Sequence, residues 1–222
     1  MRTGGGVLFM EVMCLKLGET LRAYQKNDPA ARGKVEILLL YNGLHAIIAY
    51  WISHWLYRHH LKFIARLISQ LAKWTTGVEI HPAATIGRRL VIDHGTGTVI
   101  GATAEIGDDC LIYQCVTLGG TGVVQGKRHP TLGNNVMVGS GAKVLGPIRI
   151  GDNARIAANA VVLRDVPENS TVVGVPGRIV RIGGEKTDHI HTPDPVALEL
   201  QALRQRVEAL EKTLEEMNHV SL

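Results

Sequence analysis

The segment Ile100-Gly101-Ala102-Thr103-Ala104-Glu105-Ile106-Gly107-Asp108-Asp109-Cys110-Leu111-Ile112 places an aliphatic residue at every sixth position, and this rhythm runs from Ile80 to about Val166. Gly often follows the aliphatic residue, and a mostly small residue stands four positions after it. A period of six fits neither an α-helix, which repeats about every 3.6 residues, nor a flat strand, which repeats every two. It is typical of a parallel β-helix whose coils each take three hexapeptides.

In such a coil each hexapeptide supplies one short strand and one corner, so the aliphatic side chain points into a narrow prism. Residues one coil apart stack on the same face, and each inner strand pairs with the coils above and below it. A β-sandwich of short strands is the alternative, but it would show period-two alternation with turns about every 8–12 residues. The sequence therefore favours the β-helix.

The residues before the repeats have a helical pattern, with helices expected at 11–25, 30–40, from Gly43 onward, and at 61–75. Asn27-Asp28-Pro29 is interpreted as the N-cap and first turn of the second helix. The predicted fold class is thus α+β. It comprises an N-terminal α-helical region (1–76), a left-handed parallel β-helix of hexapeptide repeats (77–182), a linker rich in Gly, Pro, Asp and Thr (183–195), and a C-terminal coiled-coil helix (196–222).

The coiled coil is predicted from apolar residues that recur at alternating intervals of four and three: Val196, Leu200, Leu203, Val207, Leu210, Leu214 and Met217. Charges of opposite sign flank this seam, which favours parallel association of several chains. A single amphipathic helix that packs on its own domain is the alternative. Because prisms of this kind often associate with parallel axes, a three-stranded seam is expected.

Charge, cysteine content and hydropathy indicate which binding partners and which cellular location the protein can have. The net charge of +4 is spread along 222 residues without a Lys/Arg block, which gives nucleic-acid binding little support. Three cysteines without metal-type spacing, and a start that lacks the plan of a signal peptide, indicate a reducing, cytoplasmic location. The apolar run 37–57 is interrupted by Asn42, His45, Ser53 and His54, so we expect a buried helix pair and no membrane span.

Functional residues are expected where the repeat breaks, because a solenoid accommodates insertions as loops and loops on a rigid scaffold carry function. Two extra residues interrupt the grid at 93–97, and a longer excursion occupies 119–131. Both breaks contain a histidine beside a charged residue. A single histidine would more often have a structural role, whereas a histidine in each of the two breaks favours a functional site.

At these positions the sequence resembles the serine O-acetyltransferases of cysteine biosynthesis. The matching motifs are Glu-Ile-His-Pro-Ala-Ala at 79–84, Asp-His-Gly-Thr-Gly at 93–97, Val-Thr-Leu-Gly-Gly-Thr-Gly at 116–122, Arg-His-Pro at 128–130 and Gly-Val-Pro at 174–176. The resemblance covers about residues 24 to 182, including Asn-Asp-Pro-Ala at 27–30 and Gly-Leu-His-Ala at 43–46. Several separated motifs in the same order make it specific.

The resemblance implies transfer of acetyl from acetyl-CoA to the hydroxyl of L-serine. His94 would be the general base, since imidazole titrates nearest the working pH. Glu79, where many family members carry Asp, would hold the other imidazole nitrogen. Asp28 and Asp93 would bind the amino group of serine, and Arg128 and His129 its carboxylate.

The resemblance further implies that acetyl-CoA, with no metal, lies in a groove between neighbouring prisms and meets backbone at Gly120, Ser140 and Ala158. The active site would then cross a subunit boundary. A homotrimer is expected because the helical region before Asn27 is short, and a hexamer is left open. O-acetylserine sulfhydrylase is a candidate partner through the tail that ends at Leu222.

Two other functions remain open at this point. A hexapeptide acetyltransferase could act on another amino acid or on a sugar hydroxyl, although sugars would leave the charges of Asp28 and Arg128 without a purpose. A metal-dependent hydratase on the same scaffold would use His81, His94 and His129 as ligands.

Overall fold

The computed structural model describes residues 4–122, 125–186, 203–207 and 210–211. The chain divides into two compact units, Met1–Thr187 and Asp188–Leu222. In the second unit the described residues 203–207 and 210–211 are helical, and their apolar side chains Leu203, Val207 and Leu210 are exposed in the single chain. Most of the predicted seam lies outside the described residues, so the coiled coil stays a prediction.

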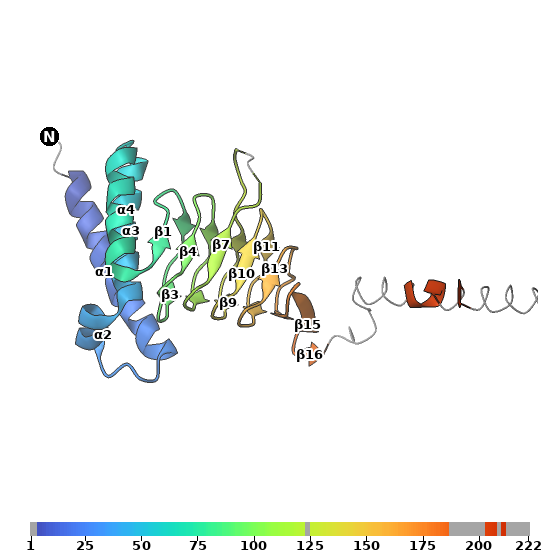
Figure 1. The fold of residues 1–222 in the computed structure, drawn as a ribbon. Helices are drawn as coiled ribbons and strands as arrows, with labels where there is room; N and C mark the ends of the chain where they lie inside the picture. Colours follow the sequence, from blue (N-terminus) through green and yellow to red (C-terminus); the bar gives the residue numbers. More distant parts are fainter. Residues whose placement is uncertain (1–3, 123–124, 187–202, 208–209, 212–222) are drawn as a thin grey trace, which may run out of the picture. The chain divides into compact units, whose positions relative to one another are not determined.

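The first unit begins with four helices, α1 (Gly4–Asn27), α2 (Lys34–Leu40), α3 (Asn42–Arg58) and α4 (Lys62–Thr76), which lie at one end of the strands (Figure 1). The helical region is confirmed, but the expected start of the second helix is wrong. Asn27 is the last residue of α1, and Gly33 precedes α2. Asp28 is therefore not an N-cap; its Oδ1 accepts the N–H of Ala30 at 2.8 Å in a local turn.

Strands β1 to β14 pair in parallel across three sheets, which rules out the β-sandwich. Sheet 1 contains β1 (Glu79–Ile80), β4 (Val99–Ile100), β7 (Thr117–Gly119), β10 (Lys143–Leu145) and β13 (Val161–Val162). Sheet 2 contains β2 (Thr85–Ile86), β5 (Glu105–Ile106), β8 (Thr131–Leu132) and β11 (Arg149–Ile150). Sheet 3 contains β3 (Val91–Ile92), β6 (Leu111–Ile112), β9 (Met137–Val138), β12 (Arg155–Ile156), β14 (Ser170–Val173), β15 (Arg178–Ile182) and β16 (Glu185–Lys186).

The aliphatic residues of the six-residue grid form the core of this prism. In sheet 1 the buried column is Ile80, Ile100, Leu118, Val144 and Val162, each aligned with the next in the strand register. Sheet 3 has the corresponding buried column Ile92, Ile112, Val138, Ile156 and Val172. The hexapeptide prediction is confirmed in its register, and the left-handed sense of the coils stays a prediction.

The parallel stack ends with β14. Strand β15 pairs with β14 in the antiparallel sense, and β16 pairs with β15 in the same way. Ordered sheet thus continues to Lys186, inside the segment 183–195 that the sequence analysis assigns to a linker.

The helices dock on the first coil through hydrogen bonds to its backbone. The Tyr24 hydroxyl donates to the carbonyl of Ile92 and accepts its N–H, both at 3.1 Å. Tyr50 donates to the carbonyl of Ala84 and Ser69 to that of Ile80, both at 2.7 Å. Gly43 permits the approach of α3, since a Cβ there would lie 2.0 Å from the Ile92 carbonyl oxygen. Several backbone groups at the open edge of the β-helix are therefore paired by the helices, which cap this end.

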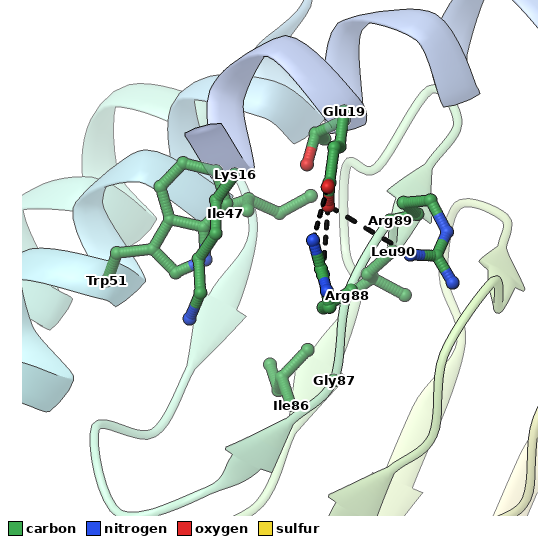
Figure 2. Close-up of a pocket in the computed structure, with 10 residues that line it drawn as sticks. Lys16, Glu19, Ile47, Trp51, Ile86, Gly87, Arg88, Arg89 and Leu90 are labelled. Carbon is green, nitrogen blue, oxygen red and sulfur yellow. Dashed lines mark hydrogen bonds and ion pairs between the residues drawn. The ribbon is translucent and has the colours of Figure 1, made fainter. Parts of the chain in front are cut away.

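An ion-pair cluster also joins α1 to the coil. Figure 2 shows Glu19 of α1 directed at Arg88 and Arg89, which follow β2. Arg88 donates through Nε to Glu19 Oε2 at 2.9 Å and through Nη2 to Oε1. Arg89 reaches Asp109 of the next coil at 2.6 Å. These contacts fix α1 against the corner between sheets 2 and 3.

Two other corners of the prism matter for the site. Corner 3/1, between sheets 3 and 1, comprises residues 93–98, 113–116, 139–142 and 157–160. Corner 1/2, between sheets 1 and 2, comprises residues 81–84, 101–104, 120–122 with 125–130, and 146–148. Each break predicted from the sequence thus lies at its own corner.

No single helix of the described residues is long and apolar enough to cross a membrane; α2 and α3 meet that test only as a pair, which is bent by 73°.

We expect Tyr24→Phe to lower the free energy of unfolding by about 1–3 kcal/mol, because it leaves the buried N–H and carbonyl of Ile92 without a partner. Urea unfolding followed by tryptophan fluorescence measures this. Tyr113→Phe is the control, since that hydroxyl makes no hydrogen bond within the described residues. Equal unfolding midpoints for the two variants would show that the hydroxyl does not hold the helices in place.

Candidate active site

His94 projects from a tight loop at corner 3/1. The backbone of His94, Gly95 and Gly97 has positive φ angles of 57°, 53° and 78°. Asn42 at the start of α3 donates through Nδ2 to the carbonyl oxygens of His94 at 3.1 Å and Thr76 at 2.9 Å. The His94 side chain is 75% exposed, and its Nε2 lies 3.9 Å from Asp93 Oδ1. The loop is fixed while the imidazole stays accessible.

Asp28 lies near this loop although it comes from the helical region. The Tyr41 hydroxyl donates to Asp28 Oδ2 at 2.5 Å. This bond, the Ala30 N–H and the charge of His94 lower the pKa of Asp28, so its carboxylate stays ionised. The same bond raises the pKa of Tyr41 to about 12. Asp28, Asp93 and His94 therefore form one group, and Tyr41 is a member that the sequence analysis missed.

A second group is built around His129 at corner 1/2. The ring lies against Gly101, where a Cβ would stand 1.9 Å from His129 Cδ2. The Thr103 N–H donates to His129 Nδ1 at 3.2 Å, and the Thr103 hydroxyl lies 2.8 Å from the same nitrogen. That hydroxyl accepts the N–H groups of Arg128 and His129 at 3.0 and 3.1 Å, so its own hydrogen points at Nδ1. Nδ1 is thus an acceptor, and the neutral ring carries its hydrogen on Nε2.

Burial, and then the charges of Arg128 and Lys127, lower the pKa of His129, which favours this neutral form. Gly120 is adjacent to Arg128, whose Cγ would lie 3.0 Å from a Cβ at that position. Arg128, His129 and Gly120 therefore lie together, and Thr103 is a further residue that the sequence analysis missed.

Glu79 lies near this second group and not against His94. Lys73 of α4 donates to Glu79 Oε2 at 2.6 Å, and Arg66 Nη2 lies 3.8 Å from Oε1. The charges of Glu79, Arg128 and His129 all act on His81, whose pKa falls to about 4, mainly through burial and then through Arg66. Within one described chain Glu79 makes no hydrogen bond or ion pair with His94, so its expected contact with that imidazole stays a prediction.

The three positions expected to meet acetyl-CoA divide between the same two corners. Ser140 and Ala158 lie at corner 3/1, one coil apart, on the corner that carries His94. Gly120 lies at corner 1/2 beside Arg128. In a single chain the candidate residues are therefore divided between two corners of the prism, corner 3/1 and corner 1/2.

A hydratase-type metal centre would need several ligands close together. In the described part of the chain, no group of three or more His, Cys, Asp or Glu residues is arranged to hold a metal ion.

Comparison with known proteins gives a family. The model of the bacterial transferase hexapeptide (six repeats) matches residues 129–164. Over 205 residues the chain is 54% identical to a serine acetyltransferase of Synechococcus elongatus, which covers 91% of this chain and 84% of that protein. The chain belongs to the serine acetyltransferase family.

Solved serine acetyltransferases also share the fold. The Neisseria gonorrhoeae enzyme superposes with a TM-score of 0.77 at 43% identity, over 80% of this chain and 67% of that one. The same enzyme in complex with serine has a TM-score of 0.74 at 42% identity, over 77% and 70% of the two chains. Membership in the serine acetyltransferase family makes this chain an acyltransferase.

We expect the His129 imidazole to titrate below the usual value of about 6.5 and to show the Nε2–H tautomer in ¹⁵N NMR. Thr103→Val should weaken that tautomer preference, because it removes the hydroxyl that donates to Nδ1. Thr85→Val, at an exposed threonine outside the site, is the control. An unchanged tautomer in Thr103→Val would mean that Thr103 does not set the orientation of this ring.

Proposed function

We propose that this chain transfers the acetyl group of acetyl-CoA to the hydroxyl of L-serine, giving O-acetylserine for cysteine biosynthesis, with His94 as the general base. The observation that carries this proposal is the exposed imidazole of His94 beside two carboxylates, in a chain of this family. A serine hydroxyl is a weak nucleophile, so a base must accept its proton as the oxygen attacks the thioester carbon. The thiolate of CoA is the leaving group.

The charges around the site suit an amino acid. Asp28 and Asp93 offer two carboxylates near His94 for the ammonium group of serine. Arg128 offers a fork of donors for the serine carboxylate, and the Nε2–H of neutral His129 offers one more. A sugar acceptor has neither charge, which disfavours that alternative. The Neisseria relative in complex with serine supports the same acceptor.

We further propose that the site forms between two chains of a homotrimer. The candidate residues divide between corner 3/1, with His94, Ser140 and Ala158, and corner 1/2, with Arg128 and Gly120. Neighbouring prisms with parallel axes would bring corner 3/1 of one chain to corner 1/2 of the next. Acetyl-CoA would lie in the groove between them, with its amide groups on backbone at Gly120, Ser140 and Ala158. Glu79 would then meet the imidazole of the neighbouring chain.

Three parts of the proposal rest on the sequence alone. The cytoplasmic location, a hexamer built from two trimers, and binding of O-acetylserine sulfhydrylase by the tail at Leu222 stay predictions. The tail lies outside the described residues.

We expect His94→Ala to lower the rate of CoA release from acetyl-CoA with L-serine by about 10²- to 10⁴-fold, because the base is lost. A thiol reagent measures the released CoA. His59→Ala, at an exposed histidine outside the site, should keep the wild-type rate. Full activity in His94→Ala would contradict the proposed base. A wild-type chain that releases CoA with other acceptors but not with serine would contradict the proposed substrate.

The shared site predicts complementation between two inactive variants. Chains with His94→Ala and chains with Arg128→Ala, co-expressed in equal amounts, should recover about a quarter of the wild-type activity, since random assembly gives that share of intact sites. Each variant alone is the control. Mixed oligomers as inactive as either parent would show that His94 and Arg128 act within one chain.

A further inference from the structure

One face of α4 carries three polar residues that converge on Glu79. Arg66, Gln70 and Lys73 follow one another at spacings of four and three, so they lie on the same side of the helix. Lys73 contacts Glu79 Oε2 at 2.6 Å and Arg66 approaches Oε1 at 3.8 Å. The Gln70 side chain makes a smaller contribution to the lowered pKa of the same carboxylate. Three side chains on successive turns of one helix therefore face one side chain of the β-helix.

The packing of α4 holds this face against the first coil. Ser69, beside Gln70, donates to the carbonyl of Ile80 at 2.7 Å. The helix ends at Thr76 and is capped by Gly77, which has a left-handed backbone and donates its N–H to the Lys73 carbonyl at 2.8 Å. Glu79 follows two residues later, at the start of β1. Lys73 and Glu79 are thus fixed on either side of the same helix end.

The position of the Arg66 guanidinium is unfavourable for hydrogen bonding but favourable for its charge interaction with Glu79. Its Nη1 is buried and has no hydrogen-bond partner within the described residues. An unpaired buried donor is unfavourable. The favourable contact of this guanidinium is its charge interaction with Glu79.

We propose that Lys73 and Arg66 are positioning residues for the reaction, which hold the Glu79 carboxylate so that Oε1 accepts a hydrogen bond from the His94 imidazole of a neighbouring chain. This inference rests on the function proposed above. Lys73 occupies Oε2, whereas Arg66 lies beyond hydrogen-bond distance of Oε1. Oε1 therefore keeps an acceptor site for an imidazole N–H.

The charges on both sides of this contact define its pH dependence. Glu79 faces Lys73 and Arg66 of α4 and the neutral His81, and the bond from Lys73 lowers the pKa of Glu79. His94 faces Asp93 and Asp28. Without the Lys73 cation the surroundings of the imidazole become more negative, which favours its protonated form. The base must be neutral, so the acid limb of the rate profile should move to higher pH.

The test is a pair of charge-removing substitutions on the same helix. Lys73→Met should lower kcat about ten-fold, with KM for L-serine changed less than about two-fold, because the imidazole is misoriented while serine still binds. The acid limb of the kcat/KM profile should shift to higher pH by about half a pH unit. Lys62→Met is the matched control, since the Lys62 ammonium lies 5.8 Å over the Tyr57 ring and does not contact Glu79. Lys73→Arg should restore most of the activity.

Each other outcome contradicts the inference. A wild-type kcat and pH profile in Lys73→Met would overturn it, as would equal losses in Lys73→Met and Lys62→Met. In a Glu79→Gln background the effect of Lys73→Met should vanish, and a persistent effect would show that Lys73 acts through another group. If Lys73→Met does not fold, Lys73→Gln is measured in the same way. Failure of the proposed function is distinct, because it would leave the wild-type chain without activity on serine.

Discussion

The strands of this β-helix are mostly two residues long, so no strand is stable without a neighbour, and the first coil has a neighbour on one side only. Its backbone would expose unpaired N–H and carbonyl groups on the other side. Tyr24, Tyr50 and Ser69 pair several of these groups from the helices. The polar tips of buried side chains thus replace the missing strands, and the apolar parts of the same helices extend the core.

The same docking builds the candidate site. Asn42 donates to the carbonyl of His94 in the first coil, while α4 ends at Thr76, three residues before Glu79. Asp28 reaches the loop of His94 from the turn between α1 and α2. The helical region is therefore both the cap of the β-helix and the source of one wall of the site. Loss of docking would therefore disturb both together.

Much of the fold could be predicted because a narrow prism accepts few kinds of side chain. Inward positions such as Ile100 and Leu118 must be aliphatic, and because they recur every six residues the pattern can be recognised in the sequence. The start of α2 could not be predicted, because Asp28 suits an N-cap and a local turn equally well, and the Tyr41 hydroxyl stabilises the turn. His94 and His129 were found at breaks of the repeat. Tyr41 and Thr103 were missed because their partners lie 13 and 26 positions away in the sequence.

The stacking of coils also fixes the spacing of the contact points for any ligand that lies along a corner. Neighbouring strands are about 4.8 Å apart, so His94 and Ala158, three coils apart at corner 3/1, are separated by about 14 Å along the prism axis. Shifting this distance by a fraction of a step is impossible without breaking the strand register. A different spacing of these contact points would require the gain or loss of a whole coil, whereas adaptation to another acceptor needs changes in the loops alone. The spacing along the corner and the identity of the acceptor can therefore evolve independently on this scaffold.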